Sequence, residues 1–146
     1  GTIAGTIDDS FETKSQLEIY NVDFSDPSTE CKMIGGVVTK DCFHSIAWGM
    51  KGDGTFKDGL IAGGMSDGSV NIWNVNAILS GDHNSLLARS DMHKGQVLGL
   101  EFHPEHHNLL ASGSADGEVF VWDLSNPREP QASRPHTKKV TAVSMN

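Results

Sequence analysis

Two ten-residue segments of this chain repeat each other 49 positions apart. Residues 59–68 (GLIAGGMSDG) align with residues 108–117 (NLLASGSADG), and each is followed by a stretch in which apolar and polar residues alternate. A fixed period of this kind decides the architecture, because one copy forms a unit that cannot bury its apolar face alone. The chain is therefore expected to consist of similar modules stacked against one another.

The repeating stretches are predicted to be β-strands, about four in each cycle. They are short runs with a period of two, bounded by Gly, Asp and Ser, which is typical of strands. One group follows the aligned segments, a second precedes them with apolar residues at i, i+3 and i+5, and a weaker third closes the cycle. These groups are residues 17–22, 70–75 and 119–124; residues 43–48, 97–102 and 140–145; and residues 33–39 and 85–90.

Equivalent strands are separated by 43 to 54 residues, which indicates the blades of a β-propeller. Known blade repeats measure about 40–45 residues, and longer loops account for the excess. The fold is expected to be all-β, with about three blades of four antiparallel strands and at most one turn of helix, at residues 76–79. As a fragment of a single propeller, the chain is expected to divide into residues 1–39 (a first blade lacking its first strand), 40–91 and 92–135 (two complete blades) and 136–146 (the first strand of the next blade).

Two Asp-Gly pairs mark the expected hairpins between the second and third strands of the complete blades. Asp-Gly favours a tight two-residue turn, because both positions accept a positive φ. Trp73 and Trp122 each follow the Asp of a pair by six residues and fall on the third strand. The pairs are Asp67 with Gly68 and Asp116 with Gly117.

The dipeptide Trp122-Asp123 resembles the signature of the WD40 family, and three further positions support the resemblance. His93, Ser112 and Asp116 match the family's hydrogen-bonded tetrad together with Trp122, and a partial WD40 β-propeller is therefore implied. An indole N–H, a hydroxyl, an imidazole and a carboxylate can form a closed chain in which each buried donor finds an acceptor. His136 repeats the position of His93 43 residues later and is expected to open another cycle.

The other cycles depart from this tetrad. Gly63 stands at the serine position of the preceding copy and Thr39 falls near its histidine position, whereas Tyr20 replaces the tryptophan in the first copy. One complete tetrad is therefore expected in the whole chain.

Catalytic and cofactor motifs are weak or absent. His93, Ser112 and Asp116 have the membership of a hydrolase triad, but the serine falls inside a strand without a nucleophile elbow, so a structural role is favoured. His103, His106 and His107 lie in one loop, and adjacent loop residues rarely converge as the three or four ligands that a metal needs. No phosphate-binding or dinucleotide-binding glycine motif occurs. We expect neither enzymatic activity nor a bound cofactor or metal.

Charge and cysteine content limit the partners and the cellular compartment that we expect for this chain. The net charge of −8 makes nucleic acid a poor partner, and no apolar stretch approaches the roughly 20 residues that cross a bilayer. Cys31 and Cys42 are too few for a disulfide framework, which favours a reducing, cytosolic environment.

The order of segments also resembles the large outer-coat subunits of the COPII vesicle coat. The resemblance covers nearly the whole chain and includes a long hairpin at residues 8–15. Its further segments are residues 11–20, 23–28, 60–64, 78–81, 109–113 and 121–124. It implies a propeller at the vertices of a membrane-coating cage that buds vesicles from the endoplasmic reticulum toward the Golgi. It further implies a smaller propeller protein as stable partner, together with other coat subunits, and a peripheral location at exit sites and vesicles.

Two functional hypotheses follow from these features. The first is a non-catalytic scaffold that contacts coat partners through loops containing Lys51, Asp53, Lys57, His106 and His107. The alternative is a WD40 adaptor that recognises a peptide or substrate protein, for example in a ubiquitin ligase complex. An open arc of blades would also expose unpaired strand edges, and self-association is therefore expected through residues 3–7 or 140–145.

Overall fold

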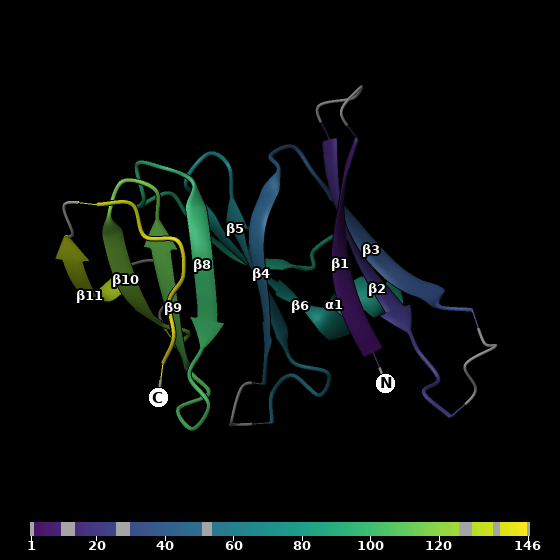
Figure 1. Cartoon of the computed structure of the whole chain (residues 1–146). Coiled ribbons are helices and arrows are strands. Elements are labelled where there is room, and N and C mark those ends of the chain that lie inside the picture. Colours follow the sequence, from purple (N-terminus) through teal and green to yellow (C-terminus); the bar gives the residue numbers. More distant parts are fainter. Residues whose placement is uncertain are drawn as a thin grey trace.

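The computed structural model of the chain describes residues 2–9, 14–25, 30–50, 54–125, 130–135 and 138–145. Within these ranges the chain forms strands and one short helix, α1 (Val75–Ser80), as Figure 1 shows. The strands are β1 (Thr2–Asp9), β2 (Lys14–Asn21), β3 (Lys32–Thr39), β4 (Phe43–Gly49), β5 (Leu60–Met65), β6 (Val70–Asn74), β7 (Leu86–Ser90), β8 (Val97–Phe102), β9 (Leu109–Ser114), β10 (Glu118–Asp123) and β11 (Pro130–Pro135).

The strands form three separate antiparallel sheets, each built from strands consecutive in the sequence. The first sheet has the order β1-β2-β3, the second β4-β5-β6-β7 and the third β8-β9-β10-β11. The sheets stand side by side in Figure 1, where β4 lies next to β8 and contacts it. The expected all-β arrangement of three, four and four strands is confirmed.

Each pair of neighbouring sheets encloses its own hydrophobic core. Leu17 and Ile19 of the first sheet pack with Ile61, Trp73 and α1 of the second. The opposite face of the second sheet packs against the third, where Trp122 is the largest buried side chain of the cluster. Because alternate residues of a strand point to opposite faces, a sheet covered on both sides needs apolar residues at consecutive positions. This explains the run at residues 60–62.

A register shift recurs at the same position in each sheet, where the third strand in the blade pairs with the outer one. It falls between Ile19 and Tyr20 in the first sheet and between Ile72 and Trp73 in the second. In the third sheet it falls between Val121 and Trp122. Such an irregularity increases the local twist of a strand pair, so the repeat seen in the sequence is also a repeat of backbone geometry.

The two Asp-Gly hairpins form as expected, but their turn geometry differs from the prediction. Only the glycines have a positive φ, +91° at Gly68 and +85° at Gly117, and no described residue other than glycine does. The Gly68 N–H donates to the Met65 carbonyl at 3.3 Å, and the Gly117 N–H donates to the Ser114 carbonyl at 3.1 Å. Each glycine therefore ends a four-residue turn, and the Asp stays in the ordinary backbone region.

The expected first strand of a further blade is absent from the described residues 138–145. The segment nevertheless packs on the third sheet: a Cβ on Gly113 would lie 2.5 Å from Val140 Cγ1, just as a Cβ on Gly64 would lie 2.7 Å from Val97 Cγ1. Val140 therefore occupies the place that Val97 has one sheet earlier. Strand geometry requires a hydrogen-bonded neighbour, and no described strand is paired with this segment.

Candidate functional site

Three of the four expected tetrad residues meet between the second and third sheets. Ser112 lies on β9, Trp122 on β10, and His93 in the loop that precedes β8. The Trp122 indole Nε1 donates a hydrogen bond to Ser112 Oγ at 2.8 Å, and His93 Nε2 lies 2.7 Å from the same oxygen. All three residues are at most 4% exposed. The network therefore joins a loop to two strands without contact with solvent.

Burial determines the charge state of His93. Ser112 Oγ accepts a hydrogen bond from Trp122 and shares a second one with His93 Nε2. Burial lowers the pKa of His93 to about 4, although the negative charges of Glu118 and Asp116 oppose this shift. The imidazole is therefore neutral at physiological pH.

Asp116 does not close the tetrad as expected. His93 Nδ1 is buried without a hydrogen-bond partner, and the carboxylate of Glu118 lies 3.8 Å away from it. Asp116 is exposed in the hairpin turn, where its carboxylate lies beside Gly95. The Asp116 side chain is therefore directed at the loop that contains Gly95 and makes no hydrogen bond to the imidazole. The hydrogen-bonded chain consists of Trp122, Ser112 and His93.

In the second sheet, Asp67 and Trp73 stand at the positions of Asp116 and Trp122, but Asp67 belongs to a different network. The Asp67 carboxylate accepts hydrogen bonds from the backbone N–H and the hydroxyl of Ser69, at 2.9 and 2.7 Å, and from Arg89 at 2.5 Å. Burial would raise the pKa of Asp67, but these donors outweigh it and hold the pKa below its ordinary value. Trp73 is 2% exposed and packs toward the first sheet. Asp67 therefore ties the hairpin to the outer strand β7.

Asp123, the second residue of the signature dipeptide, stabilises the end of its blade. Its Oδ1 accepts from the Ser125 backbone N–H at 2.8 Å and from Asn108 Nδ2 at 3.2 Å. The side chain connects the end of β10 to the loop that enters β9. Its role in the described structure is to hold two turns together.

The expected partner loops are only partly described. Lys57, His106 and His107 are exposed. His103 Nδ1 accepts from the backbone N–H groups of Glu105 and His106, at 3.1 and 3.0 Å, which organises the second loop. Three further expected residues, Lys51, Asp53 and His136, lie outside the described residues, as do residues 10–13 of the long first hairpin.

Hydrolase and metal chemistry find no support in the described part of the chain. Ser112 is fully buried and its oxygen is engaged by Trp122, so it is not available as a nucleophile. Among the described residues no group of three or more His, Cys, Asp or Glu side chains could hold a metal ion. In the same part of the chain, none of the helical segments has the length and hydropathy required to cross a bilayer.

Sequence reasoning missed three residues that the structure makes prominent. The Glu118 carboxylate lies 3.8 Å from His93 Nδ1, which has no hydrogen-bond partner, and Arg89 binds Asp67. Asn71 is 4% exposed, and its Oδ1 has no hydrogen-bond partner. Asn71 is a polar residue within an apolar strand, and this feature of the sequence could have identified it. No sequence pattern indicates the roles of Glu118 and Arg89, because the partners His93 and Asp67 are distant from them in the sequence.

The three consecutive sheets, the repeated register shift and the Trp122-Ser112-His93 network define a WD40-repeat protein with a propeller fold. Residues 84–123 match the WD40 family, described as "WD domain, G-beta repeat". The chain also resembles the solved β-propeller domain of Cps50 (Swd1) from Myceliophteria thermophila, with a TM-score of 0.56 and 19% identity over 68% of this chain and 26% of that one. This likeness concerns the fold alone.

Over nearly its whole length the chain is homologous to the SEC31 proteins. It is 37% identical over 160 residues to protein transport protein SEC31 of Dictyostelium discoideum, covering 100% of this chain and 12% of the relative. It is 41% identical over 134 residues to the SEC31 homolog B of Arabidopsis thaliana, covering 89% and 12%. It is 38% identical over 151 residues to Sec31B of Mus musculus, covering 100% and 13%. The chain spans about an eighth of the length of the curated relatives that it matches.

Proposed function

We propose that this chain is a non-catalytic scaffold segment of a COPII outer-coat subunit that acts in transport from the endoplasmic reticulum to the Golgi. The observation that carries the proposal is its 37–41% identity, over 89–100% of its length, to proteins named for protein transport. The buried, neutral His93 network supports it, because the polar residues that could suggest catalysis serve to fix a loop.

Other coat subunits are the proposed partners, among them a smaller WD-repeat propeller protein. The exposed side chains of Lys57, His106 and His107 are the proposed contacts. The protein would act in the cytoplasm, peripherally at exit sites of the endoplasmic reticulum and on vesicles, without binding nucleic acid. The blade divisions given by the sequence (1–39, 40–91, 92–135 and 136–146) remain part of this proposal.

The first sheet supplies a further element of the proposal. It has three described strands whereas the others have four, and β1 lies at its edge. A free edge presents unpaired N–H and C=O groups. We expect residues 3–7 to pair with a strand supplied by another chain or by another copy.

The test uses the full chain, tagged at one end and produced in cells with an intact secretory pathway. We expect it to concentrate at exit sites and to co-purify coat subunits, with chemical crosslinks from Lys57. A triple variant, Lys57→Ser with His106→Ser and His107→Ser, should reduce coat-subunit recovery, whereas the exposed control Lys94→Ser should leave it unchanged. A diffuse distribution together with the absence of coat subunits after crosslinking would contradict the proposal.

A further inference from the structure

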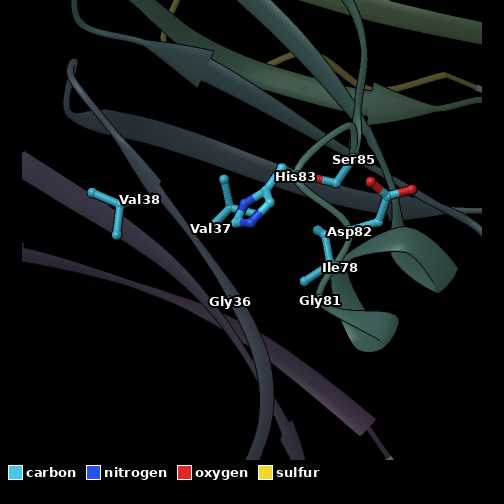
Figure 2. A pocket seen from close by; sticks show the side chains of 8 residues that line it. All are labelled: Gly36, Val37, Val38, Ile78, Gly81, Asp82, His83 and Ser85. Carbon is cyan, nitrogen blue, oxygen red and sulfur yellow. The ribbon is translucent and has the colours of Figure 1, made fainter.

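A surface groove runs between β3, the outer strand of the first sheet, and the second sheet. It consists of two adjoining hollows of about 300 and 290 Å³, which share Val37, Val38, His83 and Ser85. Figure 2 shows the first hollow, with β3 on one side and α1 and the residues after it on the other. One wall of the groove is therefore a strand that lies at the edge of its sheet.

The backbone edge of β3 forms part of this wall. Taken together, the two hollows are lined by every residue from 36 to 41, in the second half of β3 and the loop that follows it. Successive side chains of a strand point to opposite faces, so consecutive residues border one groove where the groove meets the edge of the strand. Among the described strands, β3 pairs with β2 alone. Every second residue of an antiparallel edge strand directs its N–H and C=O away from its one partner, and these groups border the groove.

This edge lacks the features that keep strand edges from pairing. β3 has eight residues, and Lys32 at its start is its only charged residue. Val38 is 61% exposed and Met33 is 42% exposed. Natural edge strands are commonly short, or they carry charged residues or proline, and these features prevent pairing with another strand. β3 is therefore suited to accept a further strand.

The outer strands of the other two sheets do have such features. β7 has five residues, and its exposed Arg89 is paired with the carboxylates of Asp67 and Asp91. β11 begins and ends with proline, at Pro130 and Pro135, and proline has no N–H to donate to a neighbouring strand. This comparison distinguishes β3 from the two strands that occupy the same place in their sheets.

The charges that line the groove cancel. Asp82 lines the first hollow, and Asp41 lines the second together with Lys40 and Arg89. Two carboxylates are thus matched by two cations. A charged side chain that entered the groove would lose hydration without gaining a net opposite charge, so the groove favours an uncharged occupant.

We propose that the edge of β3 binds an extended, uncharged segment of a partner protein, which pairs with residues 36–39 as a further strand of the first sheet. Main-chain hydrogen bonds supply the affinity, and alternate side chains of the segment lie in the hollows, beside Val37 and Leu86. The inference goes beyond the coat assignment, because it uses only the strand edge and the hollows. It also concerns the opposite edge of the sheet from β1.

The experiment measures retention of the full chain, fluorescently labelled, on beads that carry peptides eight residues long, the length of β3. One library contains only Val, Ile, Thr and Tyr in random order, because these residues favour extended strands. A matched library has proline at the two central positions, which removes one N–H from each edge of the extended peptide. We expect the proline library to retain at least about fivefold less protein, because it loses main-chain hydrogen bonds. Libraries with a central lysine or glutamate should also retain less protein than the uncharged library.

Two variants and a matched control locate the binding. Val38→Lys places a charge on the edge and should reduce retention on the uncharged library at least about tenfold, with an unchanged melting temperature because Val38 is exposed. Val38→Thr keeps a β-branched, uncharged side chain and should bind like the wild type. Leu87→Lys is the control, because Leu87 is 46% exposed on the edge strand β7 but does not line either hollow.

Equal retention of the uncharged and proline libraries would overturn the proposal. Stronger retention of either charged library would do the same, as would a folded Val38→Lys variant that binds like the wild type or an equal loss for Leu87→Lys. If no library retains the wild type, the proposal is wrong. A dimer that Val38→Lys dissociates, observed by size-exclusion chromatography, would then identify a second copy of the chain as the occupant of this edge.

Discussion

Trp122 and Ser112, on neighbouring strands of the third sheet, are joined by a hydrogen bond of 2.8 Å that is shielded from solvent. The same serine oxygen lies 2.7 Å from His93. One hydroxyl thus accepts the Trp122 N–H and fixes the loop that leads into β8, the first strand of the same sheet. The stability of this blade should therefore depend on three side chains acting together.

Replacement of the central hydroxyl should be costly. Ser112→Ala leaves the Trp122 N–H and the His93 Nε2 without partners in a buried position, so we expect the free energy of unfolding to fall by about 2–4 kcal/mol. Urea denaturation of the full chain measures this change. Ser144→Ala, at an exposed position, should stay within about 0.5 kcal/mol. Equal stabilities of the two variants would show that Ser112 has no such role.

The ring and the N–H group of Trp122 can be separated by two substitutions. Trp122→Ala removes a side chain that is 1% exposed and should cost about 3–5 kcal/mol. Trp122→Phe keeps most of the apolar area and loses the donor, so its cost should be smaller. Differential scanning calorimetry should rank the melting temperatures as wild type, Phe and Ala. A melting temperature unchanged by the alanine substitution would contradict the assigned network.

Asp116 should contribute little to stability, although it occupies the tetrad position in the sequence. It is exposed, and His93 Nδ1 has no hydrogen-bond partner. Asp116→Asn should therefore change the free energy of unfolding by no more than about 0.5 kcal/mol. Urea denaturation of Asp116→Asn, with Ser112→Ala measured in parallel, tests this expectation. A loss above about 2 kcal/mol would mean that Asp116 does complete the network in solution.

Acid should weaken the fold through His93. Its pKa falls from the ordinary 6.5 to about 4 on folding. The unfolded chain therefore binds more protons in this window, so stability decreases as the pH is lowered from about 6.5 toward 4. Between pH 7 and pH 5 the contribution is about 2 kcal/mol.

A His93→Gln variant tests this contribution, because glutamine does not titrate. Urea denaturation at both pH values should show a smaller difference for the variant than for the wild type. If both proteins lose the same stability between pH 7 and pH 5, His93 is not the titrating group.

Gly68 should tolerate substitution less than Gly81, although both have a positive φ, +91° and +74°. A Cβ at Gly68 would lie 2.4 Å from the His93 carbonyl oxygen, whereas a Cβ at Gly81 would meet nothing within 4 Å. Gly81→Ala should cost about 1–2 kcal/mol from backbone strain alone. Gly68→Ala should cost more, because it also displaces the loop of the following blade. Thermal denaturation compares the two, and equal melting temperatures would argue against the close contact.

Strands were predictable from the sequence where they repeat, because a period of two and the Asp-Gly pairs are local signals. β3 and β7 were foreseen from weaker patterns, as was the helical turn that became α1. Residues 140–145 share the strand pattern but form no strand, because strand formation needs a paired neighbour that a pattern does not supply. The Asp67-Gly68 dipeptide correctly indicated a hairpin, but it did not determine the type of turn, in which only Gly68 has a positive φ.

The candidate site was less predictable than the fold. The contact between Ser112 and Trp122 was anticipated from the resemblance to the WD40 tetrad, whereas the Asp116 carboxylate lies beside Gly95 and leaves His93 Nδ1 without a hydrogen-bond partner. Asn71 and Arg89 are opposite each other on the neighbouring strands β6 and β7. Only the three-dimensional structure reveals that the arginine is paired with carboxylates and that the amide oxygen of Asn71 has no hydrogen-bond partner.

The register shift at Tyr20, Trp73 and Trp122 has a counterpart at the opposite edge of the two four-stranded sheets, between Phe43 and Ser45 and between Val97 and Gly99. The two middle strands of each of these sheets, β5 with β6 and β9 with β10, pair without such a shift. Because an irregularity of this kind increases local twist, each four-stranded blade consists of a regular central ladder with a twisted strand pair on either side.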